Sequence, residues 1–179
     1  YVDAGVMTSV PPYGIGVPIL LGGEKAEEIS SILSRLGMNV KVVSNKVGIA
    51  SAIKMSRSIM IKGLEALVIE SYTTARAYGV EDLVLPTLAE TFPSIDWEKQ
   101  GDYFFQRVVQ HGKRRAEEMA EAARTVEEGV LAPTMTVAIS ERHAWVAAQR
   151  VAGVLKPDAK AWREHADALI AAKRKNNAN

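Results

Sequence analysis

The chain has 179 residues, 47% of them hydrophobic, and its 22 lysines and arginines nearly balance 21 aspartates and glutamates. This length supports one domain, or one domain with a small appendage, and the near-neutral charge argues against nucleic acid or an anionic membrane as the main partner. The chain has no cysteine and no run approaching the roughly 18 apolar residues of a membrane span, so neither disulfides nor thiolate metal sites are expected, and we expect a cytoplasmic protein.

Residues 1–46 predict a small α/β unit. Two short apolar runs, YVDAGVM and VPILLGG, are typical of strands, and the turn-rich TSVPPYGIG separates them. The segment GEKAEEISSILSRLG has apolar residues at helical spacing and ends at Gly37, and MNVKVVS then alternates like a returning strand. This sheet is too small to be stable on its own. The chain also begins in strand-like residues, so we expect the sequence to be a fragment of a longer protein.

Residues 47–174 predict a helical domain. The first helix, over residues 48–78, is apolar on most sides, which is typical of a central helix surrounded by others. One domain cannot easily cover it, so we expect a homodimer in which the central helices pack against each other. Pro86 is expected to kink or restart the second helix, and residues 175–179 predict a disordered tail. The later helices are expected over residues 81–92, 97–110, 111–129, 132–153 and 156–175.

The usual signatures of cofactor and metal sites are absent from the sequence. The run from Gly14 to Gly16 lacks a third glycine that opens a helix, so it predicts a hairpin loop rather than a nucleotide loop. His111, His143 and His165 lie on three different predicted helices without ligand spacing, so no metal site is expected. His111 stands out because QHGKRR interrupts a helix beside three cations. The charge run at residues 113–118 is typical of a solvated helix face.

Cations among the apolar residues of the first helix are the main candidate chemistry. Lys54, Ser58 and Glu65 fall on one helical stripe, with Arg57 adjacent to it. A lysine in such company either extends outward to solvent or lines a cavity, and spacing alone leaves both open. Burial makes an amine usable as a proton donor or acceptor near neutral pH.

The quoted stretches resemble a known family. YVDAGVM, PILLGG and the helix GIASAIKM are similar to the β-hydroxyacid dehydrogenase and phosphogluconate dehydrogenase superfamily. KMSRSIMIKGLEALVIE and HGKRRAEEMAEAARTVEEG resemble an uncharacterised helical C-terminal domain of phosphogluconate-dehydrogenase-like NAD(P)-dependent oxidoreductases. The resemblance spans Tyr1 to about Trp145. It implies a mainly α fold, namely an all-helical bundle like the 6-phosphogluconate dehydrogenase C-terminal domain, preceded by a small α/β remnant of a Rossmann domain.

The resemblance also implies roles for particular residues. Lys54 matches the family's catalytic lysine, which hydrogen-bonds the substrate hydroxyl and acts as general acid/base. Gly48 matches the glycine that opens the catalytic helix, and Lys113 lies near a family lysine beside the substrate and cofactor pocket. The family's substrate-binding turn falls on Met7, Thr8 and Ser9.

Two features depart from the family pattern. Arg57 and Ser58 occupy places where asparagines are usual, and a guanidinium there suits a carboxylate or phosphate on the substrate. The dinucleotide-binding G-x-G-x-x-G is not in this sequence, so NAD or NADP would be bound mainly by a domain absent from the chain, and the chain alone should be inactive.

The resemblance implies the substrate-binding and catalytic C-terminal portion of an NAD(P)-dependent hydroxyacid-type dehydrogenase that acts on a small anionic hydroxy substrate. The alternatives are a non-catalytic helical dimerisation module derived from such an enzyme and an imine-reductase-like relative. Retention of Lys54 argues against the imine-reductase reading, because those relatives usually replace the lysine.

Overall fold

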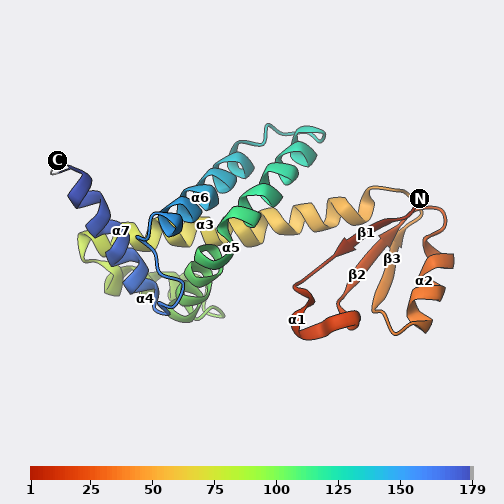
Figure 1. Ribbon diagram of the computed structural model, residues 1–179, viewed down its shortest axis with the longest axis horizontal. Helices are drawn as coiled ribbons and strands as arrows, with labels where there is room; N and C mark the ends of the chain where they lie inside the picture. The colour runs from red at the N-terminus through yellow and green to blue at the C-terminus, as the bar shows by residue number, and fades with distance from the viewer. Residues whose placement is uncertain (178–179) are drawn as a thin grey trace. The chain divides into compact units, whose positions relative to one another are not determined.

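A computed structural model describes residues 1–177, and the chain divides into two compact units, Tyr1–Ser58 and Ile59–Asn179 (Figure 1). The boundary falls inside a helix, whereas the sequence places it before that helix, at residue 46. In the first unit, strand β2 pairs antiparallel with β1 and parallel with β3, in the order β1-β2-β3. Its elements are β1 (Asp3–Val6), α1 (Val10–Tyr13), the 3-10 turn η1 (Gly14–Gly16), β2 (Ile19–Gly22), α2 (Ala26–Arg35) and β3 (Val40–Ser44).

Helix α2 and the sheet enclose the small core of the first unit. Leu21 from β2 and Ala26 from α2 are buried in it, and Ile29 and Leu33 of α2 pack against it. Apolar residues at three- and four-residue spacing on α2 therefore face the alternating apolar residues of the strands. The segment from β2 through α2 to β3 is a βαβ connection between parallel strands.

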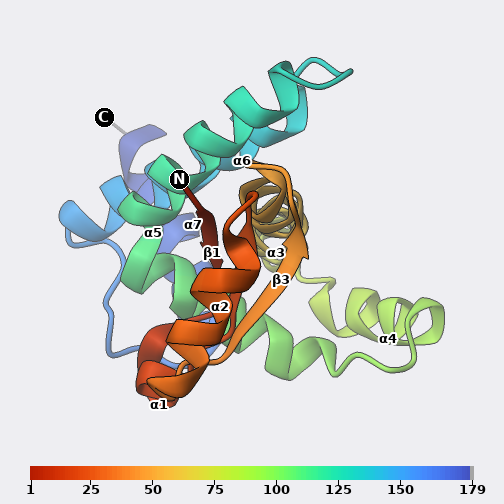
Figure 2. The same cartoon turned by 90° about the vertical axis from the view of Figure 1, so that its right-hand side faces the viewer.

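The second unit is helical throughout its described elements. Helix α3 begins in the first unit and continues through the second, and α6 lies along α5 in both views (Figures 1 and 2). The core includes Ile69 and Tyr72 of α3, Phe105 of α5, Val146 of α6 and Trp162 of α7. The bounds are α3 (Ile49–Tyr78), α4 (Glu81–Thr91), α5 (Trp97–Glu127), α6 (Thr134–Val151) and α7 (Trp162–Asn177).

The predicted fold class, mainly α with a small α/β part, is confirmed. Local signals mark several helix ends as expected. Gly79 follows α3 with φ at 68°, a conformation that favours glycine. The Asp96 carboxylate accepts a hydrogen bond of 3.1 Å from the Lys99 amide at the start of α5. Within residues 1–177, no helix combines the length and the apolar character needed to cross a membrane.

Helix α5 is one helix of 31 residues, so the predicted break at His111 and Gly112 is wrong. A Cβ added to Gly112 would lie 2.9 Å from the His143 carbonyl oxygen of α6. The glycine is therefore needed for close approach of the two helices, and the i to i−4 hydrogen bonds of α5 pass through it. His111 is consequently an ordinary member of a continuous helix.

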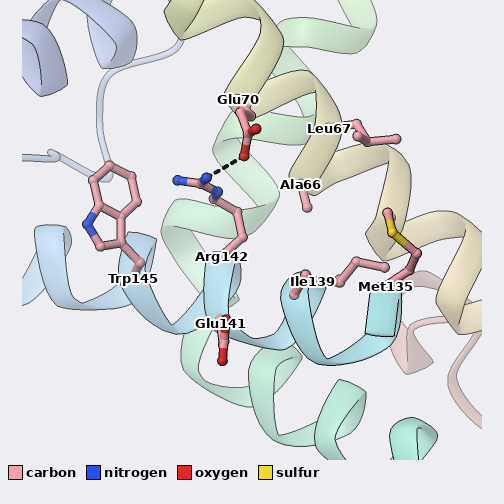
Figure 3. Close-up of a pocket in the computed structure, with 10 residues that line it drawn as sticks. Ala66, Leu67, Glu70, Met135, Ile139, Glu141, Arg142 and Trp145 are labelled. Carbon is pink, nitrogen blue, oxygen red and sulfur yellow. Dashed lines mark hydrogen bonds and ion pairs between the residues drawn. The ribbon is translucent and has the colours of Figure 1, made fainter. Parts of the chain in front are cut away.

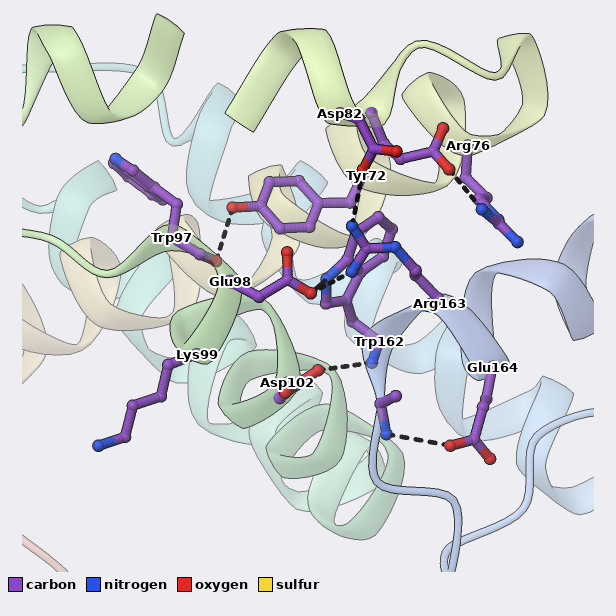
Figure 4. A network of polar contacts seen from close by, with 12 residues as sticks. Tyr72, Arg76, Asp82, Trp97, Glu98, Lys99, Asp102, Trp162, Arg163 and Glu164 are labelled. Atoms are coloured by element: carbon purple, nitrogen blue, oxygen red, sulfur yellow. Dashed lines mark hydrogen bonds and ion pairs between the residues drawn. The ribbon is translucent and has the colours of Figure 1, made fainter. Parts of the chain in front are cut away.

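Two further helix boundaries differ from the sequence prediction. Helix α4 runs through Pro86 without restarting, because the missing amide frees only the carbonyl of Asp82 in the first turn. Helix α7 begins at Trp162, after the expected start at residue 156, where Asp102 of α5 accepts the Trp162 amide at 2.8 Å (Figure 4). It continues to Asn177, into the tail predicted to be disordered; residues 178–179 lie outside the described part.

Candidate functional site

Asp3 joins strand β1 to the first turn of α3. One of its carboxylate oxygens accepts the Ser51 amide at 3.0 Å, and the other accepts the Ser51 hydroxyl at 2.6 Å. Burial pushes the pKa of Asp3 up, but hydrogen bonds from Ser51 and from the amides of Gly48 and Ala50 outweigh it and lower the pKa. The ionised carboxylate at the start of a helix also interacts favourably with the helix dipole. We call this contact the Asp3–Ser51 clamp.

Glycines allow the backbone of α3 to approach the sheet closely. A Cβ added to Gly5 of β1 would lie 3.0 Å from the Ala50 carbonyl oxygen, and one added to Gly22 of β2 would lie 2.9 Å from the Lys46 carbonyl oxygen. Gly48, directly before α3, has φ at 92°, which side chains rarely adopt. The sequence between β3 and α3 is therefore built to seat the start of α3 on strands β1 and β2.

Lys54 lies in the second turn of α3, one turn beyond the clamp. Its Cβ lies 3.6 Å from the position that a Cβ on Gly5 would take, so the base of the Lys54 side chain lies beside β1. The side chain is half-buried, which lies between the two possibilities that the sequence left open, extension into solvent and burial in a cavity. Because the clamp fixes the first turn of α3 against β1, it also fixes the base of the Lys54 side chain.

The other predicted site residues divide between the two units. In the first unit, Met7, Thr8 and Ser9 directly follow β1, and the Met7 amide donates to the Pro18 carbonyl oxygen at 3.0 Å. Arg57 is exposed and Ser58 half-buried on α3, one turn after Lys54. Lys113 is an exposed residue of α5 in the second unit.

The sequence reasoning missed Asp3 and Ser51. A pairing across 48 residues leaves no local pattern. The available signal was an aspartate inside an apolar strand, because such a carboxylate needs a partner when it is buried.

The second unit buries an ionic cluster among α3, α5 and α6. Arg115 donates two hydrogen bonds to the Glu65 carboxylate, one of them from Nε at 2.8 Å, and His143 Nε2 lies 3.2 Å from the same carboxylate. His143 Nδ1 lies 2.8 Å from the Ile139 carbonyl oxygen, so the two ring nitrogens each face an oxygen atom. Beside the cluster, Lys62 pairs with Glu118 at 3.0 Å.

Within the cluster, burial pushes the pKa of Glu65 up, but hydrogen bonds from His143 and Arg115 outweigh it and lower the pKa. Arg115 belongs to the charge run predicted to be a solvated face, and it is buried instead. Glu65 shares the stripe of Lys54 in sequence, yet its partners are structural. The cluster fixes the packing of three helices, because a shifted helix would leave a buried charge unpaired.

Two adjoining grooves open beside α3 in the second unit. The larger, of about 450 Å³, lies between α3 and α6, and Figure 3 shows Leu67, Met135 and Trp145 around it, with the Glu70–Arg142 ion pair at its edge. The smaller, of about 390 Å³, lies between α3 and α4. None of the site residues predicted from the sequence lines either groove.

The chain is similar to a protein family and to individual proteins whose descriptions give no activity. Residues 75–146 match a family described as a domain of unknown function, DUF1932. An uncharacterized 28.5 kDa protein in the 7S RNA 5′ region of Methanothermus fervidus is 33% identical over 120 residues, which cover 65% of this chain and 46% of that protein.

Two solved structures are similar over most of the chain. A conserved hypothetical protein from Sinorhizobium meliloti 1021 matches with a TM-score of 0.85 and 40% identity, over 95% of this chain and 56% of that one. The conserved protein MTH1747 of unknown function, whose structure is described as similar to 3-hydroxyacid dehydrogenases, matches with a TM-score of 0.69 and 34% identity, over 83% of this chain and 58% of that one.

The chain therefore matches the DUF1932 model over residues 75–146, and its structure is similar to that of a protein described as similar to 3-hydroxyacid dehydrogenases. The resemblance stated from the sequence is confirmed at this level. The chain spans about half the length of the relatives it matches.

Proposed function

We propose that this chain is the substrate-binding and catalytic C-terminal portion of an NAD(P)-dependent oxidoreductase, which transfers hydride between nicotinamide and a small anionic hydroxy substrate. The observation that carries the proposal is the half-buried Lys54, held beside Gly5 by the Asp3–Ser51 clamp. A lysine whose base is fixed in this way fits the preorganisation that proton transfer requires. The relation to a protein similar to 3-hydroxyacid dehydrogenases supports this reaction class.

In this proposal Lys54 handles the proton at the substrate oxygen. During oxidation of the hydroxyl, the neutral amine accepts the hydroxyl proton; during reduction of the carbonyl, the ammonium donates it back to the same oxygen. Nicotinamide supplies or accepts the hydride when it is bound.

The anionic part of the substrate is assigned to Arg57. Its guanidinium is exposed one turn after Lys54 and can pair with a carboxylate or phosphate through two parallel hydrogen bonds. Ser58, on the same side of α3 as Lys54, can donate and accept a hydrogen bond. The proposed turn at residues 7–9 would supply further hydroxyl and backbone groups.

The described residues fit the substrate side of such a site and do not fit the pyrophosphate of a dinucleotide. Gly14–Gly16 forms a 3-10 turn that leads into strand β2, so it offers no helix N-terminus to an anion. We therefore assign NAD or NADP mainly to a domain that this chain does not contain. Lys113 is the exposed cation through which this chain would contact the cofactor.

Replacing Lys54 tests the proposal. Small hydroxy acids are screened with NAD⁺ and NADP⁺ against the full-length protein, and turnover of the best pair is compared with that of Lys54→Ala. We expect a loss of roughly a hundred- to ten-thousand-fold, as for removal of a general acid/base. Lys41→Ala, which removes an exposed lysine of the same unit, is the matched control and should retain parental turnover. A Lys54→Ala variant within a few-fold of the parent would contradict the assignment.

A second candidate is a non-catalytic helical dimerisation module. The observation in its favour is that both grooves described above lie on the helical unit and contain none of the proposed catalytic residues. The same screen separates the two candidates. If no hydroxy acid is turned over with either cofactor while the helical unit still associates, the module is the better description.

A further inference from the structure

Three basic side chains follow one face of α5 in the helical unit. Arg107, His111 and Arg114 stand at steps of four and three, which places them within about 60° of one another around the helix axis. Arg107 and His111 are half-buried, and Arg114 is exposed. His111 therefore lies between two arginines on a surface that solvent reaches.

Helix α6 adds a fourth basic side chain to this face. Arg150 Nη1 donates hydrogen bonds to the carbonyl oxygens of Val109 at 3.2 Å and Gln110 at 2.8 Å, both on α5 directly before His111. These contacts hold the guanidinium against α5 without neutralising it, because a carbonyl oxygen carries no formal charge. We call the four side chains the α5 cation patch; it consists of Arg107, His111, Arg114 and Arg150.

The patch has few counter-ions of its own. Within residues 1–177, three of its members form no ion pair, and Arg114 reaches Glu118 only at 3.8 Å. Glu118 is already paired with Lys62 at 3.0 Å. Other arginines of the same unit each pair with a carboxylate, namely Arg76, Arg115, Arg142 and Arg163. Neutralisation by a carboxylate is thus common in this unit, and most of the patch is left without it.

The patch also repels itself. Burial lowers the pKa of His111, and neighbouring positive charges lower it further because they disfavour the imidazolium; these charges belong to Arg107, Arg114, Arg115 and Arg150. Like charges at steps of three or four destabilise a helix. An anion at the patch would therefore relieve a repulsion in addition to accepting hydrogen bonds.

Arg107 has donor capacity that the described residues do not use. Its Nε is shielded from solvent and has no hydrogen-bond partner within residues 1–177. Its guanidinium carbon lies 5.8 Å from the centre of the Tyr103 ring, a contact that leaves the positive charge in place. The Arg107 guanidinium is therefore held at the patch without an acceptor.

A compact anion with two negative charges fits these donors. Guanidinium groups present parallel N–H donors that match the oxygens of a phosphate, and the His111 imidazole can donate one more hydrogen bond. The three arginines carry three positive charges, so a single carboxylate would leave two of them uncompensated. A phosphate dianion compensates more of the charge and offers more acceptor oxygens.

We propose that the α5 cation patch is a binding site for a phosphate group, of the kind carried by phosphorylated small molecules and by nucleotides. Lys113, assigned above to the cofactor, lies on another face of α5, because it is six residues from Arg107. The proposal therefore depends neither on the reaction assigned to Lys54 nor on the contact assigned to Lys113.

The first test follows the ring signals of His111 by NMR in the purified protein during a pH titration. A bound anion favours the imidazolium, so inorganic phosphate should raise the pKa of His111, while acetate at the same ionic strength should not. His111→Gln identifies the signal by its loss. An unchanged pKa of His111 in phosphate, or an equal rise in acetate, would overturn the proposal.

The second test measures affinity by calorimetry with inorganic phosphate and with pyrophosphate. Arg107→Gln and Arg114→Gln should each raise the Kd at least about tenfold, as for the loss of a charge-assisted hydrogen bond. Arg124→Gln removes an exposed arginine elsewhere on α5 and should leave the Kd unchanged.

The two probes also separate the sources of the phosphate group. Tighter binding of pyrophosphate would indicate a nucleotide, and tighter binding of phosphate would indicate a phosphorylated small molecule; either result supports the site. Arg114 is exposed, so its variant remains informative if Arg107→Gln fails to fold. No binding of either probe, or parental affinity in the Arg114 variant, would contradict the assignment.

Discussion

Asp3 and Glu65 are both buried carboxylates that hold α3 in place, one in each unit, and their partners differ in kind. Asp3 is 6% exposed and accepts hydrogen bonds from uncharged groups, a serine hydroxyl and backbone amides at the start of α3. Glu65 is 0% exposed and is held by the Arg115 guanidinium, with the His143 ring beside it. Removing one of several neutral donors costs little free energy of folding. Removing the counter-ion of a buried ion costs more, because the remaining charge is left uncompensated.

The largest effect is therefore expected from Arg115→Ala. It leaves the Glu65 carboxylate buried beside a cavity, and we expect a loss of about 3–5 kcal/mol in the free energy of unfolding. Urea denaturation of the helical unit measures this change. The matched control is Arg114→Ala, which removes the exposed neighbouring arginine and should cost less than about 1 kcal/mol. Equal losses from the two variants would contradict the view that the buried Arg115–Glu65 pair contributes more to stability than an exposed arginine.

Asp3→Ala should have a smaller and more local effect. Loss of the clamp removes the hydrogen bonds at the start of α3, and we expect a cost of about 1–2 kcal/mol, as for a lost helix cap. Hydrogen exchange should speed up at the Ser51 amide and leave amides of the ionic cluster unchanged. Glu24→Gln, at an exposed position of the same unit, serves as control. If the position of Lys54 depends on the clamp, Asp3→Ala should also reduce kcat more than it raises KM.

Lowering the pH should weaken both contacts, and the change in the free energy of unfolding at each pH step is the smallest of the expected effects. The pKa values of Asp3 and Glu65 are lowered from their ordinary values of 3.8 and 4.5. Each group therefore stabilises the fold fully above its unfolded pKa, and this contribution is lost as pH falls below that value through the folded one. Unfolding by urea at a series of pH values should show stability falling below about pH 4.5. Arg115→Ala should flatten the part of that curve due to Glu65.

Structural features that depend only on residues close together in the sequence, such as helix ends and strands, could be predicted. Gly37 and Gly79 after α2 and α3 and Asp96 before α5 mark helix ends by their own conformational preferences, and the alternating strands follow from burial on one face. Gly112 was misread because its reason lies in α6, at the His143 carbonyl, and not in its own helix. A glycine required by a tertiary contact looks the same in sequence as one that ends a helix.

The same distinction between local signals and contacts of distant residues applies to the candidate site. Lys54 could be singled out because a cation in an apolar stretch is visible locally, and its catalytic role stays a prediction. The partners of buried charges could not be found, since Asp3 and Ser51 are 48 residues apart and Glu65 and Arg115 are 50 apart. Helical periodicity gives the face that a residue occupies, but it does not say which other helix covers that face.

The close approach of Gly5 to Ala50 has a consequence for how this protein can change over evolutionary time. The Cβ of any side chain at position 5 would lie 3.0 Å from the Ala50 carbonyl oxygen, so even alanine would require a small shift of α3 away from β1. Position 51 is freer to vary than position 3, because the Asp3 carboxylate still accepts backbone amides at the start of α3 when the Ser51 hydroxyl is lost. We therefore expect relatives to keep glycine at position 5 and to change residue 51 more often than residue 3.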